Sequence, residues 1–174
     1  MKDVKDYIST IPDFPTPGVM FRDVTSVISD PEGFRLAVDK LTGLLDGVEY
    51  DVIAAVESRG FLFGTPIAYN ENKSLILVRK KGKLPRETVE ATYDLEYGTA
   101  TIEVHRDAIR PGQKVVIIDD LIATGGTIEA TAGLVEQLGG EVVKAIFLIE
   151  LPDLKGRERL KKYDVASVVQ FEGE

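Results

Sequence analysis

Two apolar runs, separated by a short polar loop and a helical segment, constrain the fold of this chain more than any other feature. The first run is 114-KVVIID-119 and the second is 142-VVKAIFLIEL-151. Between them a helix is expected to start at Thr127 and to stop at Gly139 and Gly140, because apolar residues recur there at helical spacing. A strand, a helix and a second strand in this order need a crossover connection, which predicts that the two strands pair in parallel.

The same alternation of strands and helices begins near residue 50. Further strands are expected at residues 50–58, 74–80, 99–109 and 165–171, and further helices at residues 30–47, 60–70 and 155–163. We therefore predict an α/β fold with a central, mostly parallel sheet flanked by helices. The length of 174 residues fits a single domain that spans residues 1–174.

Composition excludes several classes of protein. The chain has no cysteine and one histidine, His105, which excludes disulfides, thiolate catalysis and zinc sites built from cysteine or from several histidines. No apolar run reaches the roughly 18–20 residues that span a membrane, and the N-terminus lacks the apolar stretch of a signal peptide. We therefore expect a cytoplasmic protein. The net charge of −8 disfavours binding to nucleic acid or to an anionic membrane.

The loop after the first apolar run carries the residues of an anion site. In open α/β sheets, ligands bind at the carboxyl ends of the strands, and residues 119–127 occupy such an end. Two glycines, Gly125 and Gly126, let the backbone approach a ligand closely. The hydroxyl groups of Thr124 and Thr127 and the free N–H groups of the following helix add donors, which suits a phosphate group.

Two adjacent carboxylates, Asp119 and Asp120, precede this loop. They cannot bind phosphate, but they suit neighbouring sugar hydroxyl groups or a divalent cation, so the combination describes a ribose 5-phosphate. The alternative is a capped turn with two solvated aspartates. The chain lacks the G-x-x-x-x-G-K-[ST] motif, and the loop lacks the G-x-G-x-x-G motif of dinucleotide-binding folds.

Five segments of the chain together carry a family resemblance. They are 14-FPTPGVMFRDVTSVISDP-31, 57-ESRGFLFGTPIA-68, 79-RKKGKLPRET-88, 93-YDLEYG-98 and 115-VVIIDDLIATGGTIEAT-131. In this order they resemble the type I phosphoribosyltransferases, which use phosphoribosyl pyrophosphate (PRPP), and among them the adenine phosphoribosyltransferases. The resemblance implies the type I phosphoribosyltransferase fold, with a small N-terminal hood at residues 12–28 and a mobile catalytic loop at residues 82–98.

The resemblance also implies an activity. The phosphoribosyl group of PRPP would be transferred to N9 of adenine, giving AMP and pyrophosphate, by a homodimer. Magnesium (Mg²⁺) would enter with PRPP, without direct protein ligands. Two alternatives are a PRPP-binding regulator of transcription and a phosphoribosyltransferase for another base. The regulators carry a DNA-binding domain ahead of the PRPP domain, and here the resemblance starts within the first 15 residues.

Roles for individual residues follow from the same resemblance. Asp119 and Asp120 would lie by the ribose hydroxyl groups and act in catalysis. The residues expected to hold the 5-phosphate are Ala123, Thr124, Gly125, Gly126 and Thr127. The residues expected at the pyrophosphate are Glu57, Ser58, Arg59, Arg79, Lys80 and Lys83, with a cis peptide bond between Glu57 and Ser58. Taken without the family, the same residues describe an ordinary strand–helix turn and surface charges.

The base and its protons have candidates as well. Met20, Phe21 and Arg22 of the hood are expected near the purine, where their backbone groups, and not the arginine head, would recognise the edge of the base. Leu151 is expected to pack on the other face of the purine. Core packing is the alternative for Phe21 and Leu151. Related 6-oxopurine enzymes carry an acid at the position of Ala123, and alanine cannot replace it. The resemblance therefore implies that Glu96 acts as the acid or base at N7 of the purine, and that Tyr97 helps to close the loop. A surface carboxylate is the alternative for Glu96.

Overall fold

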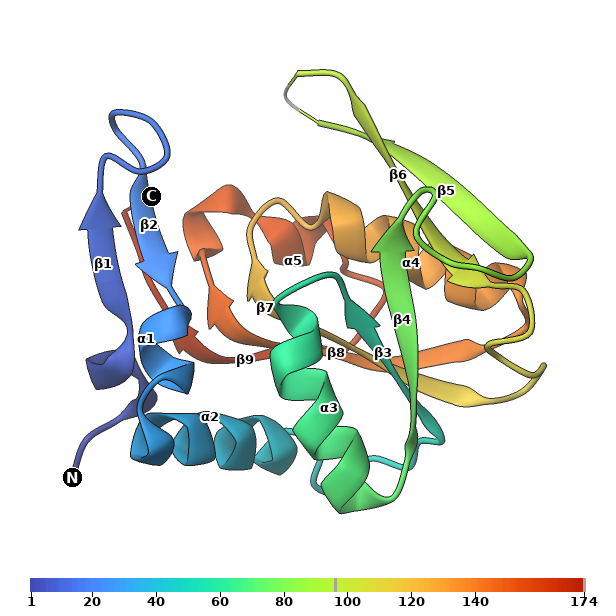
Figure 1. Ribbon diagram of the computed structural model, residues 1–174, viewed down its shortest axis with the longest axis horizontal. Coiled ribbons are helices and arrows are strands. Elements are labelled where there is room, and N and C mark those ends of the chain that lie inside the picture. Colours follow the sequence, from blue (N-terminus) through green and yellow to red (C-terminus); the bar gives the residue numbers. More distant parts are fainter. Residues whose placement is uncertain (96, 174) are drawn as a thin grey trace.

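A seven-stranded sheet in the order β5-β6-β4-β3-β7-β8-β9 forms the centre of the computed structural model, which describes residues 1–95 and 97–173 (Figure 1). The strands are Val52–Val56 (β3), Ser74–Lys80 (β4), Thr88–Asp94 (β5), Thr99–His105 (β6), Lys114–Ile122 (β7), Glu141–Glu150 (β8) and Val165–Gln170 (β9). Strands β4, β3, β7, β8 and β9 pair in parallel, whereas β5 and β6 form an antiparallel hairpin that joins β4. The predicted α/β fold with a mostly parallel sheet is confirmed.

Helices cover both faces of this sheet. They are Thr25–Ile28 (α1), Pro31–Gly43 (α2), Gly60–Glu71 (α3), Gly126–Gln137 (α4) and Gly156–Arg159 (α5). Strand β3 is buried throughout: Ile53 and Ala55 pack into the core under α1, α2 and α3, and its other three residues pack into the core under α4. Such a strand reads as a continuous apolar run because neither of its faces meets water. Among the described residues, no helix is long and apolar enough to cross a membrane.

A second, two-stranded sheet forms near the N-terminus; its second strand lies in the segment expected to be the hood, and its first strand begins at Ser9, before residue 12 where the hood was expected to start. Strands Ser9–Pro12 (β1) and Met20–Asp23 (β2) pair in antiparallel fashion. Two short 3₁₀ helices complete the structure, Val4–Tyr7 (η1) before the hood and Pro152–Leu154 (η2) after β8. In Figure 1 the hood stands at the left and the β5–β6 hairpin at the right of the central sheet.

The segment expected as a mobile loop at residues 82–98 contains regular structure. Strand β5 occupies Thr88–Asp94 and pairs with β6 from Thr88 opposite His105 to Asp94 opposite Thr99. Its inward side chains, Val89, Ala91 and Tyr93, contact the core under α4, and the residues between them are polar. The structure therefore differs from the expectation of a loop. The alternation of apolar and polar residues is weak in this segment, but the segment forms a strand because it pairs with the stronger strand β6 beside it.

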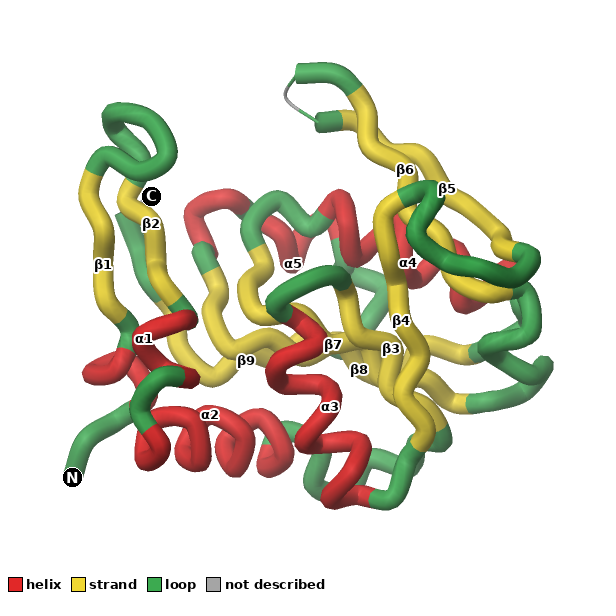
Figure 2. The backbone as a smooth tube through the Cα atoms, in the orientation of Figure 1, coloured by secondary structure: helices red, strands yellow, loops and turns green. Residues whose placement is uncertain are grey.

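The order of the strands creates a crevice between β3 and β7. From β3 the chain passes through α3 to β4 on one side, and from β7 it passes through α4 to β8 on the other. The loops that leave these neighbouring strands therefore diverge, and ligands of open α/β sheets bind at such a point. Figure 2 shows both loops together at one edge of the sheet.

Candidate active site

Three adjoining cavities lie at the carboxyl ends of β3 and β7. The first, of about 240 Å³, is lined by Glu57, Ser58, Arg59, Lys80, Asp119 and Asp120. The second, of about 110 Å³, is lined by Asp119 and residues 121–128. The third, of about 350 Å³, is lined by Gly18, Val19, Met20, Phe21, Arg22, Arg59, Leu121, Leu151 and Leu154. Because Asp119, Arg59 and Leu121 each line two of them, the three cavities form one cleft.

Backbone groups build the second cavity, which we call the phosphate cavity. Gly125 has a φ of 87° and precedes the first residue of α4. A Cβ atom at this position would lie 3.0 Å from the carbonyl oxygen of Gly156, so both the conformation and the space require glycine. Within the described chain no side chain caps α4. Its first N–H groups and the positive end of its dipole are therefore free to bind an anion.

Asp119 and Asp120 stand near the end of β7, where the first two cavities meet. The backbone N–H of Asp120 donates to Oδ1 of Asp119 at 2.8 Å, and Nε of Arg59 donates to Oδ2 of Asp120 at 2.6 Å. Burial of Asp119, together with the negative charge of Asp120, raises the pKa of the Asp119 carboxyl well above its usual range. Asp120 is therefore paired with a cation, whereas Asp119 would be stabilised by hydroxyl donors or a cation brought by a ligand.

The loop after β3 lies directly against Asp119. A cis peptide bond joins Glu57 and Ser58, as expected from the sequence. Next in the chain, a Cβ atom at Gly60 would lie 3.0 Å from the carbonyl oxygen of Ile118 and 3.1 Å from Oδ1 of Asp119. Glycine at this position therefore lets the start of α3 approach the end of β7.

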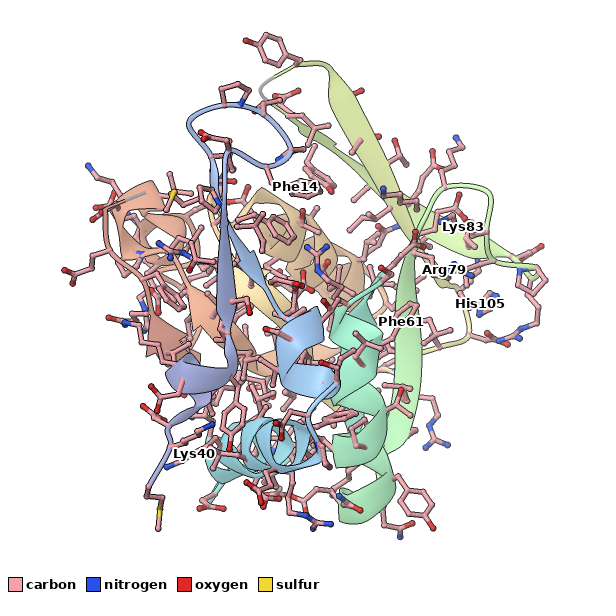
Figure 3. The ribbon with its side chains drawn as sticks, turned by 60° about the vertical axis from the view of Figure 1, so that its left-hand side comes forward. Phe14, Lys40, Phe61, Arg79, Lys83 and His105 are labelled. Carbon is pink, nitrogen blue, oxygen red and sulfur yellow. The ribbon has the colours of Figure 1, made fainter. Side chains whose placement is uncertain are left out.

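A cluster of cations surrounds Glu57. Nε of Arg79 donates to Oε1 of Glu57 at 2.9 Å, the backbone N–H of Lys80 donates to the same oxygen at 3.2 Å, and Nζ of Lys83 donates to Oε2. Burial acts to raise the pKa of the Glu57 carboxyl, but the hydrogen bonds from Lys83 and Arg79 outweigh it and lower the pKa. Figure 3 shows Arg79 and Lys83 at the end of β4, beside the β5–β6 hairpin.

The third cavity, which we call the base cavity, is mainly apolar and lies under the hood. The rings of Phe14 and Phe21 meet edge to face with their centroids 5.1 Å apart, and the Arg59 guanidinium lies 5.9 Å from the Phe21 ring. The head of Arg22 contacts the hood strand β1 and the C-terminal segment, since its Nη1 donates to Oγ1 of Thr10 at 2.7 Å and its Cζ lies 4.3 Å from the Phe171 ring. The mainly apolar lining of this cavity suits a flat aromatic group.

Comparison with known proteins shows to which family the chain belongs. The model of the phosphoribosyl transferase domain family matches residues 33–173. The adenine phosphoribosyltransferase of Butyrivibrio fibrisolvens is 69% identical over 99% of this chain and 96% of its own length. The chain belongs to the adenine phosphoribosyltransferase family. The resemblance carried by the five sequence segments is thereby confirmed.

Solved structures of adenine phosphoribosyltransferases have the same fold. The enzyme from Thermoanaerobacter pseudethanolicus superposes with a TM-score of 0.94 at 51% identity, covering 97% of this chain and 98% of its own. The enzyme from Saccharomyces cerevisiae, crystallised with an imino-altritol bisphosphate and adenine, superposes with a TM-score of 0.90 at 38% identity, covering 95% and 96% of the two chains.

Most residues singled out in the sequence of this adenine phosphoribosyltransferase meet in the cleft. Those that line it are Glu57, Ser58, Arg59, Lys80, Asp119, Asp120, Ala123, Thr124, Gly125, Gly126, Thr127, Met20, Phe21, Arg22 and Leu151. Arg79 and Lys83 reach it only through Glu57. Tyr97 is 87% exposed and lines none of the three cavities, and Glu96 lies outside the described residues.

Other residues of the phosphoribosyltransferase site were not singled out in the sequence. Leu121 near the end of β7 and Leu154 in η2 line the base cavity, and apolar residues at such positions carry no signal that separates them from core. Glu150, 4% exposed, accepts hydrogen bonds from Nε and Nη2 of Arg157 at 2.7 and 2.9 Å. This bidentate pair fixes the end of β8 immediately before Leu151. The sequence indicates this pair in one way: a charged residue, Glu150, ends an apolar strand, and an arginine follows it seven residues later.

Proposed function

We propose that this chain transfers the 5-phosphoribosyl group of PRPP to N9 of adenine, giving AMP and pyrophosphate, and so serves purine salvage. The observation that carries the proposal is the meeting of three cavities at Asp119, Arg59 and Leu121. One cavity is built of backbone N–H groups, one of cations and carboxylates, and one of apolar side chains. PRPP and a purine need these three surroundings for a phosphate, a pyrophosphate and a base.

Adenine is the base that the site and the family favour. The solved yeast relative holds adenine. Ala123 leaves the phosphate loop without the acid that 6-oxopurine enzymes place there, so this loop offers no carboxyl group to the imidazole nitrogen of the base. We assign the purine to the base cavity, between Phe21 of the hood and Leu151 after β8.

We assign the phosphate groups of PRPP to the other two cavities. The 5-phosphate binds at the start of α4, where N–H groups and the hydroxyl groups of Thr124 and Thr127 converge. The pyrophosphate binds beside Arg59 and Lys80. Arg79 and Lys83 now donate hydrogen bonds to the Glu57 carboxylate. They contribute to pyrophosphate binding when they donate to phosphate oxygens instead.

The reaction is a displacement at C1′ with inversion. N9 of adenine attacks as the bond from C1′ to pyrophosphate breaks, so positive charge develops on the ribose ring. Asp119 and Asp120 orient the ribose hydroxyl groups and place negative charge beside the ring. Arg59 stabilises the departing pyrophosphate. Glu96 acts as the acid or base at N7, and the 82–98 segment with Tyr97 closes over the site to exclude water.

Magnesium fits this site as a companion of PRPP. No group of three or more acidic, histidine or cysteine side chains that could hold a metal occurs among the described residues. Mg²⁺ commonly binds through substrate phosphates and keeps several waters, so the ion would enter bound to PRPP and lie with the pyrophosphate beside Arg59 and Lys80. When bound, the ion would neutralise charge on the leaving group.

A cytoplasmic homodimer is the form we propose for the active enzyme, on the strength of the family resemblance. Light scattering on the purified protein would report a mass of two chains. A mass of one chain in an active preparation would contradict the dimer.

The proposed reaction is tested by incubating the protein with PRPP, magnesium and a panel of purines. AMP formed from adenine alone is the expected result. Turnover of another purine in preference to adenine would reassign the base. PRPP binding without turnover of any base would favour a regulatory protein that uses PRPP as a signal.

A further inference from the structure

A hydrogen bond joins the β5–β6 hairpin to the phosphate cavity. Oγ1 of Thr127, in the first turn of α4, donates to the hydroxyl oxygen of Tyr93 on β5 at 3.0 Å. The Tyr93 ring packs against the core under α4, and a Cβ atom at Gly126 would lie 3.6 Å from its Cδ2. The Tyr93 side chain therefore lies against the loop that we assign to the 5-phosphate, although it comes from a different part of the sheet.

The two hydroxyl groups can respond to an anion. When a phosphate oxygen accepts the proton of Thr127, the Thr127 oxygen becomes free to accept the proton of Tyr93. The hydrogen bonds then run in one direction, from Tyr93 to Thr127 to phosphate, and an anionic acceptor strengthens both. Tyr93 would thus hold the Thr127 hydroxyl in the orientation that donates to phosphate.

The position of Tyr93 also matters for the hairpin. Asp94, the next residue, ends β5, and the turn that follows leads through Tyr97 to β6. An anion that strengthens the bond between Thr127 and Tyr93 therefore strengthens the attachment of the hairpin to α4. We propose that Tyr93 is a positioning residue that couples binding of the 5-phosphate to docking of the β5–β6 hairpin. This inference rests on the proposed function, which places the 5-phosphate beside Thr127.

The test compares the affinities of two ligands for the full-length protein by calorimetry. In Tyr93→Phe the dissociation constant for ribose 5-phosphate should rise about three- to tenfold, as expected for one hydrogen bond. The dissociation constant for inorganic pyrophosphate should stay unchanged, because pyrophosphate binds at Arg59 and Lys80. In turnover, the KM for PRPP should rise while the KM for adenine does not. Equal weakening of both ligands would indicate a structural defect and overturn the inference.

Two further variants sharpen the test. Tyr163 also forms a hydrogen bond with a residue of α4, because its hydroxyl donates to Glu136 at the opposite end of the helix. Tyr163→Phe makes the same chemical change there and should leave both affinities unchanged. Thr127→Val removes the group through which Tyr93 acts, so adding Tyr93→Phe to it should weaken ribose 5-phosphate binding no further.

The outcomes separate this inference from the function on which it rests. Wild-type affinity for ribose 5-phosphate in Tyr93→Phe, or an additional loss in the double variant, would overturn the coupling and leave the proposed function standing. A wild-type protein that binds neither ribose 5-phosphate nor pyrophosphate would overturn the proposed function, and this inference with it.

Discussion

Nε of Arg59 lies 2.6 Å from Oδ2 of Asp120, and this ion pair joins the loop that leaves β3 to the C-terminal part of β7. The arginine side chain is 49% exposed and the aspartate side chain 7% exposed, so the cation faces the cleft and the carboxylate lies beneath it. A ligand anion can therefore reach Arg59 without removing its partner. The pair holds Arg59 in place before pyrophosphate arrives, which lowers the ordering cost of binding.

Replacing Asp120 tests the role of this pair in turnover. Asp120→Asn keeps the shape of the side chain and removes the charge that pairs with Arg59 and that we assign to the ribose, so kcat/KM for PRPP should fall about 10²-fold. Circular dichroism should show an unchanged fold. The matched control is Asp51→Asn, since Asp51 accepts the backbone N–H of Lys114 at the opposite end of β7. Wild-type activity in Asp120→Asn would remove the residue from the mechanism.

Replacing Glu57 tests the exchange of partners at the pyrophosphate cavity. Its carboxylate pairs with Arg79 and Lys83, so under the proposed function it would compete with pyrophosphate for these cations and repel the incoming anion. Glu57→Gln should therefore lower the dissociation constant of pyrophosphate about fivefold, which corresponds to roughly 1 kcal/mol for one partly screened charge. Calorimetry at two ionic strengths would measure it, with a smaller gain at high salt. Weaker binding in the variant would show that Glu57 holds these cations ready rather than competing for them.

Replacing Asp119 tests the cost of a charge that is partly removed from solvent and lies next to Asp120. The folded-state pKa of this carboxyl is raised above its unfolded value, so the folded protein loses stability as the pH rises through the folded pKa. Asp119→Asn should raise Tm at pH 7 by about 2–4 °C, and the gain should vanish at pH values below the ordinary aspartate range, where both states are protonated. Turnover should fall. A Tm gain that persists in acid would point to packing instead of charge.

The sequence predicts the sheet well because its central strands are apolar runs buried on both faces, as in Val52–Val56. It does not predict the pairing of Arg59 with Asp120, which lie 61 residues apart, because the spatial order of the strands is independent of their order in the chain. It also leaves strand β5 unrecognised, since only Val89 of its inward residues is fully buried. The sequence shows the basic run at residues 79–83, but it does not show that Arg79 and Lys83 pair with Glu57, because this pairing depends on the turn after β4.

Replacing Glu96 tests the assignment of proton transfer. Alanine at this position removes the carboxyl group proposed to act at N7 of the purine, so kcat should fall about 10²-fold. Direct PRPP binding should change little, because we assign all its phosphate groups to other segments. Glu90→Ala is the control, since Glu90 is a carboxylate of the same hairpin that pairs with Lys81 at the surface. Unchanged kcat in Glu96→Ala would exclude Glu96 from the chemistry.

Replacing Gly60 tests how closely the start of α3 must approach β7. A Cβ atom there would lie 3.0 Å from the carbonyl oxygen of Ile118 and 3.2 Å from Cα of Asp119, and neither backbone atom can yield without moving β7 or the start of α3. Gly60→Ala should therefore displace Asp119 by a few tenths of an ångström and lower kcat/KM about tenfold. Gly43→Ala is the matched control because a Cβ atom at the end of α2 meets nothing within 4 Å. That variant should keep full activity and gain roughly 0.5–1 kcal/mol in the free energy of unfolding. Equal activity in the two variants would show that α3 and β7 tolerate a wider separation at the site than their contact indicates.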